Sequence, residues 1–257
     1  MSARGGWLAV VGTGPGDPAW MTPETAAILA EATDLVGYKP YLDRVASAGQ
    51  TYHASDNREE MDRAGLALDL AAEGRRVAVV SGGDPGVFAM AAAVWEALEI
   101  APHARWGSVT VTVAPGVSAM QAVAARAGAP LGNDFCAISL SDNLKPWPVI
   151  LKRLRLAAEA DFAMAFYNPI SRARPWQLGE ALALLREWWA AETPVVIGTA
   201  VGRADEEVTL TTLAEADPTM ADMRSLVIVG ASTTRLLRRP NGQAIVYTPR
   251  FYREGGE

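Results

Sequence analysis

Val11-Gly12-Thr13-Gly14-Pro15-Gly16-Asp17 is a glycine-rich turn that directly follows an apolar, β-branched run. A second turn of this kind, Ser81-Gly82-Gly83-Asp84-Pro85-Gly86, follows another such run. Each turn precedes a segment with helical periodicity, and glycine allows a backbone to approach a ligand closely. Each turn also carries an aspartate, which repels a phosphate group at short range. The two turns therefore predict a ligand that resembles a nucleotide but is not anionic at the turn.

The first turn departs from both common phosphate-binding patterns. A dinucleotide-binding turn has a third glycine where this chain has Asp17, and a P-loop has a lysine followed by serine or threonine. The alternative interpretation is that both segments are tight turns in which Asp17 and Asp84 cap the structure that follows. The spacing of the residues leaves both interpretations open.

Strand–turn–helix units recur through the first half of the chain. This order predicts an α/β fold with a mostly parallel N-terminal sheet, in which ligands bind beyond the carboxyl ends of the strands. Turns 12–17, 81–86 and 115–118 are then expected to line one site. Residues 37–41 are predicted to be a loop, and Asp56-x-x-Glu59 resembles a capping box that opens a helix ending at Gly74. Strands are expected at 7–11, 34–36, 77–80 and 109–113, and further helices at 23–32, 87–98 and 119–127.

The second half has a different pattern, in which strands dominate. One long helix is clear at residues 175–191, and the basic run 152–155 is interpreted as a solvated helix face. This pattern predicts an α+β domain with a mixed or antiparallel sheet. The predicted domains are 1–114 and 115–238, followed by a partly ordered tail at 239–257. Strands are expected at 135–140, 162–167, 194–200, 208–213 and 226–229.

Composition narrows the functional class. The 257 residues carry a net charge of −6, and neither half of the chain is basic, so binding to nucleic acid has little electrostatic support. The single cysteine, Cys136, allows no internal disulfide and is expected to be a buried apolar side chain. No signal peptide and no membrane-spanning run is recognisable, which predicts a cytoplasmic protein without a membrane partner.

Three motifs resemble those of the tetrapyrrole (class III) methyltransferases, over a region from Leu8 to about Ala231. The motifs are Gly12-Thr13-Gly14-Pro15-Gly16-Asp17, Gly82-Gly83-Asp84-Pro85 and Ala114-Pro115-Gly116-Val117-Ser118-Ala119. The resemblance implies S-adenosylmethionine as cofactor, with S-adenosylhomocysteine as its product. It also implies a two-domain fold with a ligand cleft between the domains, a tetrapyrrole substrate and a homodimer.

Four further motifs resemble the branch of this family that methylates a precorrin at carbon 17 and contracts the ring. The same patterns occur in enzymes of the cobalt-containing route, and another precorrin methylase is a further alternative. An alternative from a different class is a nucleotide-binding regulatory protein. The motifs are Val36-Gly37-Tyr38-x-x-Tyr41, Asp56-Asn57-Arg58-Glu59-Glu60, Ser139-Leu140-Ser141-Asp142-Asn143-Leu144-x-Pro146-Trp147 and Phe166-Tyr167-Asn168-Pro169-x-Ser171-x-Arg174.

The resemblance also implies which residues contact the cofactor. Asn168 stands where other members of the family have a methionine, which changes the chemistry at that position. The implied contacts are Pro15, Gly82, Gly83, Asp84, Val87, Ser118, Ala119, Asn168, Val201, Gly230 and Ala231.

Ring contraction requires proton transfers and therefore acid or base groups. Asp17, Tyr41 and Asp142 are the candidates, with Asp84 and His53 considered beside them. The simpler alternatives are that the aspartates cap turns and that His53 is a satisfied histidine. Basic residues in loops are expected to bind substrate carboxylates, although solvated surface charge also explains them. These are Lys39, Arg58, Lys145, Arg172 and Arg174, and no metal site is expected.

Overall fold

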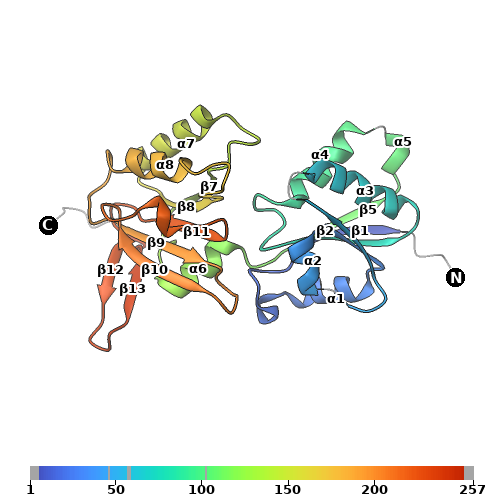
Figure 1. Cartoon of the computed structure of the whole chain (residues 1–257), viewed down its shortest axis with the longest axis horizontal. Coiled ribbons are helices and arrows are strands. Elements are labelled where there is room, and N and C mark those ends of the chain that lie inside the picture. The colour runs from blue at the N-terminus through green and yellow to red at the C-terminus, as the bar shows by residue number, and fades with distance from the viewer. Residues whose placement is uncertain (1–5, 46, 57–58, 102, 252–257) are drawn as a thin grey trace. The chain divides into compact units, whose positions relative to one another are not determined.

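The computed structural model describes residues 6–251 except residues 46, 57, 58 and 102. The chain divides into two compact units, Met1–Ala119 and Met120–Glu257. Figure 1 draws the first unit in blue to green and the second in green to red. The division falls five residues beyond the predicted boundary, at the start of helix α6 (Ala119–Ala127).

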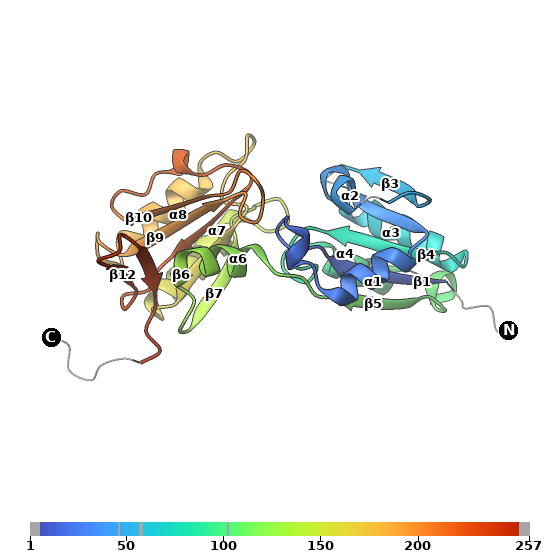
Figure 2. The same ribbon diagram turned by 90° about the horizontal axis from the view of Figure 1, so that it is seen from below.

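The first unit contains a five-stranded parallel sheet with the strand order β3-β2-β4-β1-β5. Figure 2 shows β3 at one edge of this sheet and β5 at the other. Of the three inner strands, β1 and β4 are rich in valine and almost fully buried, as expected for strands covered on both faces. The prediction of a parallel N-terminal sheet is therefore confirmed. The strands are β1 (Trp7–Gly12), β2 (Asp34–Tyr38), β3 (Thr51–Ser55), β4 (Arg76–Ser81) and β5 (Thr110–Ala114).

Helices cover both faces of this sheet (Figure 1). Helices α3 and α4 pack on Val10 and Val79, whereas α1 and α2 pack on Val11 and Val80, because alternate residues of a strand face opposite sides. The helical segments are η1 (Pro18–Trp20), α1 (Pro23–Glu31), α2 (Lys39–Val45), α3 (Glu60–Ala72), α4 (Met90–Ile100) and α5 (His103–Trp106).

Two local predictions in this unit are wrong. Residues 37–41 are not a loop, because Gly37 and Tyr38 complete β2 and α2 begins at Lys39. The buried side chain of Leu42 packs this short helix on the sheet. This tertiary contact could not be predicted from the sequence, because Gly37 and Pro40 favour a loop. Helix α4 begins at Met90 and not at residue 87, because the turn extends through Phe88, whose φ is +51°.

The second unit contains a five-stranded mixed sheet with the order β10-β9-β11-β8-β7. Strands β7 and β8 are parallel, whereas β11 runs antiparallel to both β8 and β9. The predicted mixed sheet is confirmed. The strands are β7 (Phe135–Ser139), β8 (Ala163–Tyr167), β9 (Pro194–Thr199), β10 (Glu207–Thr212) and β11 (Ser225–Val229).

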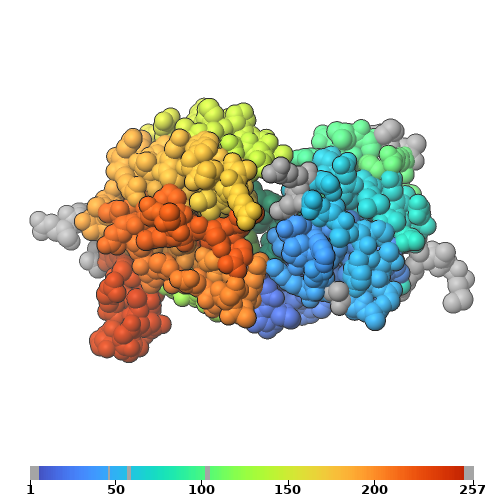
Figure 3. All heavy atoms as spheres, in the orientation of Figure 1, coloured from blue at the N-terminus to red at the C-terminus, as the bar shows by residue number. Residues whose placement is uncertain are grey.

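A second, three-stranded sheet has the order β12-β13-β6, from Arg235–Arg238, Ala244–Tyr247 and Gly128–Ala129. Strand β13 lies within the range 239–257 that was expected to form a tail. The β12–β13 hairpin is the red projection of this unit in Figure 3.

The sequence patterns indicated only part of the long helix α7 (Trp147–Glu159), through the basic run 152–155, whose interpretation as a solvated helix face is confirmed. It buries Ile150 and Leu154 against the core of the second unit and carries the basic run 152–155. Pro148 reads as a helix breaker, but proline fits the first turn of a helix because its missing N–H has no intrahelical partner there. The predicted helix 175–191 is also shorter than expected and is α8 (Gln177–Leu185). A second 3-10 turn, η2, spans Pro218–Met220.

Cys136 is partly buried and packs against the core of the second unit. Burial raises the pKa of its thiol to about 11. The thiolate is therefore scarce at neutral pH, which agrees with the expected apolar role. No helix of the described chain has both the length and the apolar character that crossing a bilayer demands.

The buried carboxylate of Asp34 is expected to stabilise the protein at neutral pH and to lose this effect in acid. It is 1% exposed, and it accepts hydrogen bonds from Thr33 Oγ1 (2.8 Å), His53 Nε2 (2.9 Å) and Arg75. Burial opposes the charged form, but these hydrogen bonds outweigh it and hold the pKa of Asp34 below its ordinary value. A carboxyl with a lowered folded-state pKa stabilises the protein above its unfolded pKa of about 4, and this stabilisation disappears as the pH falls through the folded value.

We expect Asp34→Asn to lower the free energy of unfolding by about 1–3 kcal/mol at pH 7. The difference from the unmodified protein should shrink as the pH is lowered below about 4. Urea unfolding at a series of pH values measures both. A difference that stays constant from pH 7 to pH 3 would contradict the role assigned to this carboxylate.

Candidate functional site

The three glycine-containing turns lie at one edge of the parallel sheet. They follow β4, β1 and β5, which are adjacent and parallel, so that their carboxyl ends meet. The first two turns are joined by backbone bonds, since Gly14 N–H donates to Gly83 O (3.2 Å) and Gly83 N–H donates to Gly14 O (2.8 Å). The hydroxyl of Thr13 also donates to Ser81 O (3.0 Å). The predicted meeting of these turns is confirmed within this unit.

Asp84 connects the second turn to the third. Its Oδ1 accepts a hydrogen bond from Gly86 N–H (2.8 Å), and its Oδ2 accepts one from Gly116 N–H (3.1 Å). Both carboxylate oxygens therefore hold backbone in place. This is a larger structural role than capping a single turn, and it sets the separation of two turns at the site.

Three glycines of these turns leave no room for a side chain. A Cβ at Gly12 would lie 2.6 Å from Gly83 O, and a Cβ at Gly116 would lie 2.2 Å from the same oxygen. At Gly82 a Cβ would lie 2.8 Å from the ring of Tyr41. These glycines therefore allow the backbones of the three turns to pack closely on one another and on Tyr41.

The remaining expected cofactor contacts of this unit fall at the same edge. Ser118 is buried, and the position of a Cβ on Gly83 lies 3.8 Å from Ser118 Cα and Ala119 N. Val87 N–H donates to Asp84 O (3.3 Å), so Val87 belongs to the second turn. Pro15 is half-buried in the first turn.

In the second unit, the carboxyl ends of β7, β8 and β9 share one edge of the mixed sheet, because β8 and β9 both run antiparallel to β11. Asn168 directly follows β8 and has a φ of +50°. Its Nδ2 donates to Ser139 Oγ (3.0 Å) at the end of β7. Val201 follows β9 and is buried.

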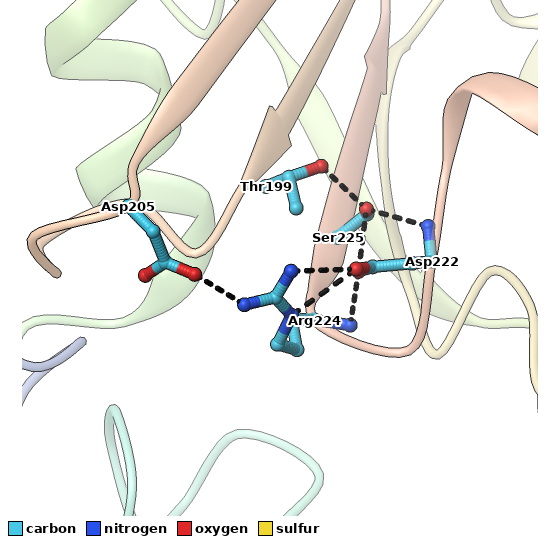
Figure 4. Close-up of polar contacts among 5 residues, drawn as sticks. All are labelled: Thr199, Asp205, Asp222, Arg224 and Ser225. Carbon is cyan, nitrogen blue, oxygen red and sulfur yellow. Dashed lines mark hydrogen bonds and ion pairs between the residues drawn. The ribbon is translucent and has the colours of Figure 1, made fainter.

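An ion-pair network fastens the segment after β9 (Figure 4). The guanidinium of Arg224 contacts Asp205 at 2.5 Å and Asp222 at 3.0 Å, and Ser225 Oγ lies 2.7 Å from Thr199 Oγ1. The hydrogen bond from Arg224 holds the pKa of Asp205 below its usual value. Ala200 N–H also donates to Arg224 O (3.2 Å), so the network sets the path of the chain leading to Val201.

Gly230 and Ala231 lie at the opposite end of the strands from Val201. They follow β11, which is antiparallel to β9, and Gly230 N–H donates to Pro194 O (2.9 Å) at the start of β9. A Cβ at Gly230 would lie 2.6 Å from Thr234 Cβ, and Ala231 N–H donates to Thr234 Oγ1 (2.8 Å). These two residues therefore pack against Thr234, a few residues further along the chain, at the end of the strands opposite to Val201.

The candidate acid and base groups have distinct environments. Asp17 Oδ1 accepts from Ala19 N–H (2.8 Å) and caps η1, as the capping alternative predicts. The ring of Tyr41 lies 5.5 Å from that of Tyr38 in an edge-to-face arrangement, beside Gly82. Asp142 Oδ1 accepts from Gln177 Nε2 (3.2 Å). His53 is satisfied by Asp34, as described above.

The candidate substrate-binding cations also differ from one another. Lys39 is exposed and paired with Asp43 (2.8 Å). Lys145 is half-buried, and burial followed by the charge of Arg153 lowers its pKa. Arg172 is exposed, and Arg174 Nη1 donates to Asn168 O (3.3 Å), so that Arg174 lies at the edge formed by β7 and β8. Arg58 lies outside the described residues.

Two polar residues near these edges escaped sequence reasoning. Arg63 is 4% exposed, and it donates to Ser55 Oγ (2.8 Å) and Asp56 O (2.5 Å) at the carboxyl end of β3. Gln177 is 1% exposed. Both lie on the buried face of an amphipathic helix. A polar residue at a position where the helical period predicts an apolar one was the sequence signal that could have identified them. Among the described residues, no cluster of three or more His, Cys, Asp or Glu side chains is arranged to hold a metal ion.

Comparisons with known proteins agree with this geometry. The profile of the Tetrapyrrole (Corrin/Porphyrin) Methylases matches residues 8–217. The chain is 60% identical over 248 residues to the Precorrin-3B C(17)-methyltransferase of Sinorhizobium sp, covering 96% of this chain and 97% of that protein. It is 42% identical to the Probable cobalt-factor III C(17)-methyltransferase of Salmonella typhimurium, covering 95% and 99% of the two chains. The crystal structure of the methyltransferase CobJ superposes with a TM-score of 0.89 at 53% identity, over 95% of this chain and 100% of that one.

Proposed function

Because the chain belongs to the tetrapyrrole (corrin/porphyrin) methylase family, we propose that it methylates carbon 17 of precorrin-3B and contracts the ring to give precorrin-4. One observation carries this proposal, namely the 60% identity to the Sinorhizobium precorrin-3B C(17)-methyltransferase over nearly the full length of both chains. Membership of an enzyme family removes the alternative of a nucleotide-binding regulatory protein.

S-adenosylmethionine is the proposed methyl donor. When bound, it supplies an electrophilic methyl group on a positively charged sulfonium. The three turns of the first unit fit such a ligand, since their described glycines leave a backbone-lined edge and their charged side chains, Asp17 and Asp84, are acidic. Gly82, Gly83, Ser118 and Ala119 would provide the closest contacts.

The chain's own task in methyl transfer is positioning. The methyl carbon and the ring carbon must be held about 3–3.5 Å apart and in line. The carbon of a reduced macrocycle is already nucleophilic, so this step needs no strong base. The turns contribute by holding their backbones at set separations, the second and third through Asp84 and the first and second through the bonds between Gly14 and Gly83.

Proton transfer and substrate binding are proposed for the polar groups of the two sheet edges. Asp17, Tyr41 and Asp142 are the candidates for contact with the macrocycle, and Asp17 also caps η1 through its Oδ1. Arg174 is the favoured partner for a substrate carboxylate, because its recorded bond to Asn168 O uses one of five N–H donors. Lys39, Lys145 and Arg172 remain candidates for the other carboxylates.

Incubation with purified precorrin-3B and methyl-labelled S-adenosylmethionine tests the proposal. We expect one labelled methyl group in the product and the absorption spectrum of a contracted ring. Product that gains a methyl group without contraction would assign the chain to a different precorrin methylase. Omission of precorrin-3B is the matched control, because label must then stay with the cofactor.

A second candidate substrate is the cobalt-containing analogue, which the 42% identity to the Salmonella protein favours. Parallel assays with the two substrates decide between them by the ratio of their kcat/KM values. Faster turnover of the cobalt-containing substrate would replace the first proposal.

We also propose that the protein is a cytoplasmic homodimer. Trp188 is 46% exposed beside the buried Trp189, so its indole offers apolar surface to a second copy. Light scattering during size-exclusion chromatography measures the assembly directly, and a mass equal to that of one chain would contradict the dimer.

A further inference from the structure

Gln177 occupies a position where an apolar side chain would be the ordinary choice. It begins helix α8, is 1% exposed and is followed on the same buried face by Leu178, Ala181 and Leu182. Its Oε1 is buried and has no hydrogen-bond partner among the described residues. A buried amide with an unpaired oxygen is unfavourable unless its other bonds compensate.

The bond that Gln177 does make is directed at a candidate catalytic group. Its Nε2 donates to Asp142 Oδ1 at 3.2 Å. Asp142 is half-buried in the segment after β7, whereas Gln177 starts a helix 35 residues further along the chain. Helix α8 therefore holds the carboxylate of Asp142 in place, although Asp142 itself lies in an irregular segment.

The segment that carries Asp142 is anchored on its other side as well. Ser139 Oγ accepts hydrogen bonds from Ser141 N–H (3.3 Å) and Asn168 Nδ2 (3.0 Å). The bond from Gln177 goes to Asp142 Oδ1, and no described residue donates a hydrogen bond to Oδ2. Oδ1 of Asp142 is thus fixed, and Oδ2 can accept a hydrogen bond from a ligand.

We propose that Gln177 is a positioning residue, which fixes Oδ1 of Asp142 so that Oδ2 accepts a hydrogen bond from the tetrapyrrole. This inference rests on the proposed function, in which Asp142 contacts the substrate. A donor that holds one oxygen of a carboxylate also sets the plane of the group, and reaction rates are sensitive to small errors in such geometry.

A double-mutant cycle tests this role. We expect Gln177→Met, which preserves size but lacks the donor, to lower kcat about tenfold while KM for precorrin-3B stays within about twofold. Asp142→Asn should lower kcat about 100-fold. The double variant should be no slower than Asp142→Asn alone, because Gln177 acts through Asp142.

Two controls separate positioning from loss of structure. Leu178→Ala removes a buried side chain from the same turn of α8, and it should lower Tm while leaving kcat close to that of the unmodified protein. Affinity of Gln177→Met for S-adenosylmethionine, measured by calorimetry, should be unchanged.

The outcomes distinguish this inference from the function on which it rests. If Gln177→Met has normal kcat while Asp142→Asn is impaired, the positioning role is wrong and the role of Asp142 stands. Additive effects in the double variant would also overturn the positioning role. Normal kcat in Asp142→Asn would overturn both assignments, and absence of methylation by the unmodified protein would overturn the proposed function.

Discussion

Gly116→Ala is expected to weaken binding of S-adenosylmethionine by at least about 100-fold, the loss that a misplacement of about 1 Å can produce. The new Cβ would lie 2.2 Å from Gly83 O and 2.8 Å from Gly12 O, and both are backbone atoms that cannot rotate away. The third turn must then move away from the first two. We expect an accompanying loss of about 1–3 kcal/mol in stability, as for other overpacked sites. Calorimetric titration and urea unfolding measure the two effects.

Gly65→Ala is the matched control for this variant. Gly65 lies in α3 of the same unit, and the nearest atom to its added Cβ is Trp106 Cη2 at 4.0 Å. Alanine favours a helix over glycine by roughly 0.5–1 kcal/mol, so this variant should be as stable as the parent or more so. Normal cofactor affinity in Gly116→Ala would show that the cofactor does not use these turns.

Asp84→Arg is expected to abolish binding of S-adenosylmethionine. The substitution replaces the two acceptors for Gly86 and Gly116 with a group that only donates, and it places a positive charge near the proposed sulfonium. The protein should remain folded, because Asp84 is at the edge of the sheet and outside the buried apolar core. Calorimetry and circular dichroism test both statements, and unchanged affinity would mean that the site is misplaced.

Asp84→Asn reveals how the carboxylate acts. S-adenosylhomocysteine lacks the positive charge of S-adenosylmethionine, so an electrostatic role of Asp84 predicts a larger loss of affinity for the charged ligand. A role restricted to holding the turns predicts equal losses for both ligands. Asp43→Asn is the control, since Asp43 lies in α2 of the same unit, pairs with Lys39 at the surface and should change neither affinity appreciably.

Much of the fold was predictable because local chemistry and tertiary packing agree. The β-branched runs of β1 and β4 form strands buried on both faces, and helix α6 ends where Gly128 adopts a φ of +130°. The prediction of a tetrapyrrole methyltransferase is also confirmed, by the family profile over residues 8–217 and by the relative of 60% identity. The bounds of helix α7 were not predicted, because Pro148 obscured an otherwise clear apolar face.

The candidate site was predictable only where its turns follow adjacent parallel strands, whose carboxyl ends meet. Gly230 and Ala231 resemble the other strand-end motifs, yet they lie at the far end of their sheet because β11 is antiparallel to β9. Strand direction depends on pairing between residues distant in sequence, so the local sequence of a turn does not predict it. Gln177 was missed for a related reason, since its partner Asp142 is 35 residues away.

The sequence by itself determined that three glycine-containing turns follow strands and that their charged residues are acidic, because strand propensity and glycine's freedom are local properties. Only the tertiary structure decided that Asp84 joins two of those turns and that Gly12 and Gly116 leave no room for a side chain. These contacts are made between strands that are separated by tens of residues and are brought together by a shared sheet. A local pattern therefore identifies the turns, and the packing of the sheet makes them one site.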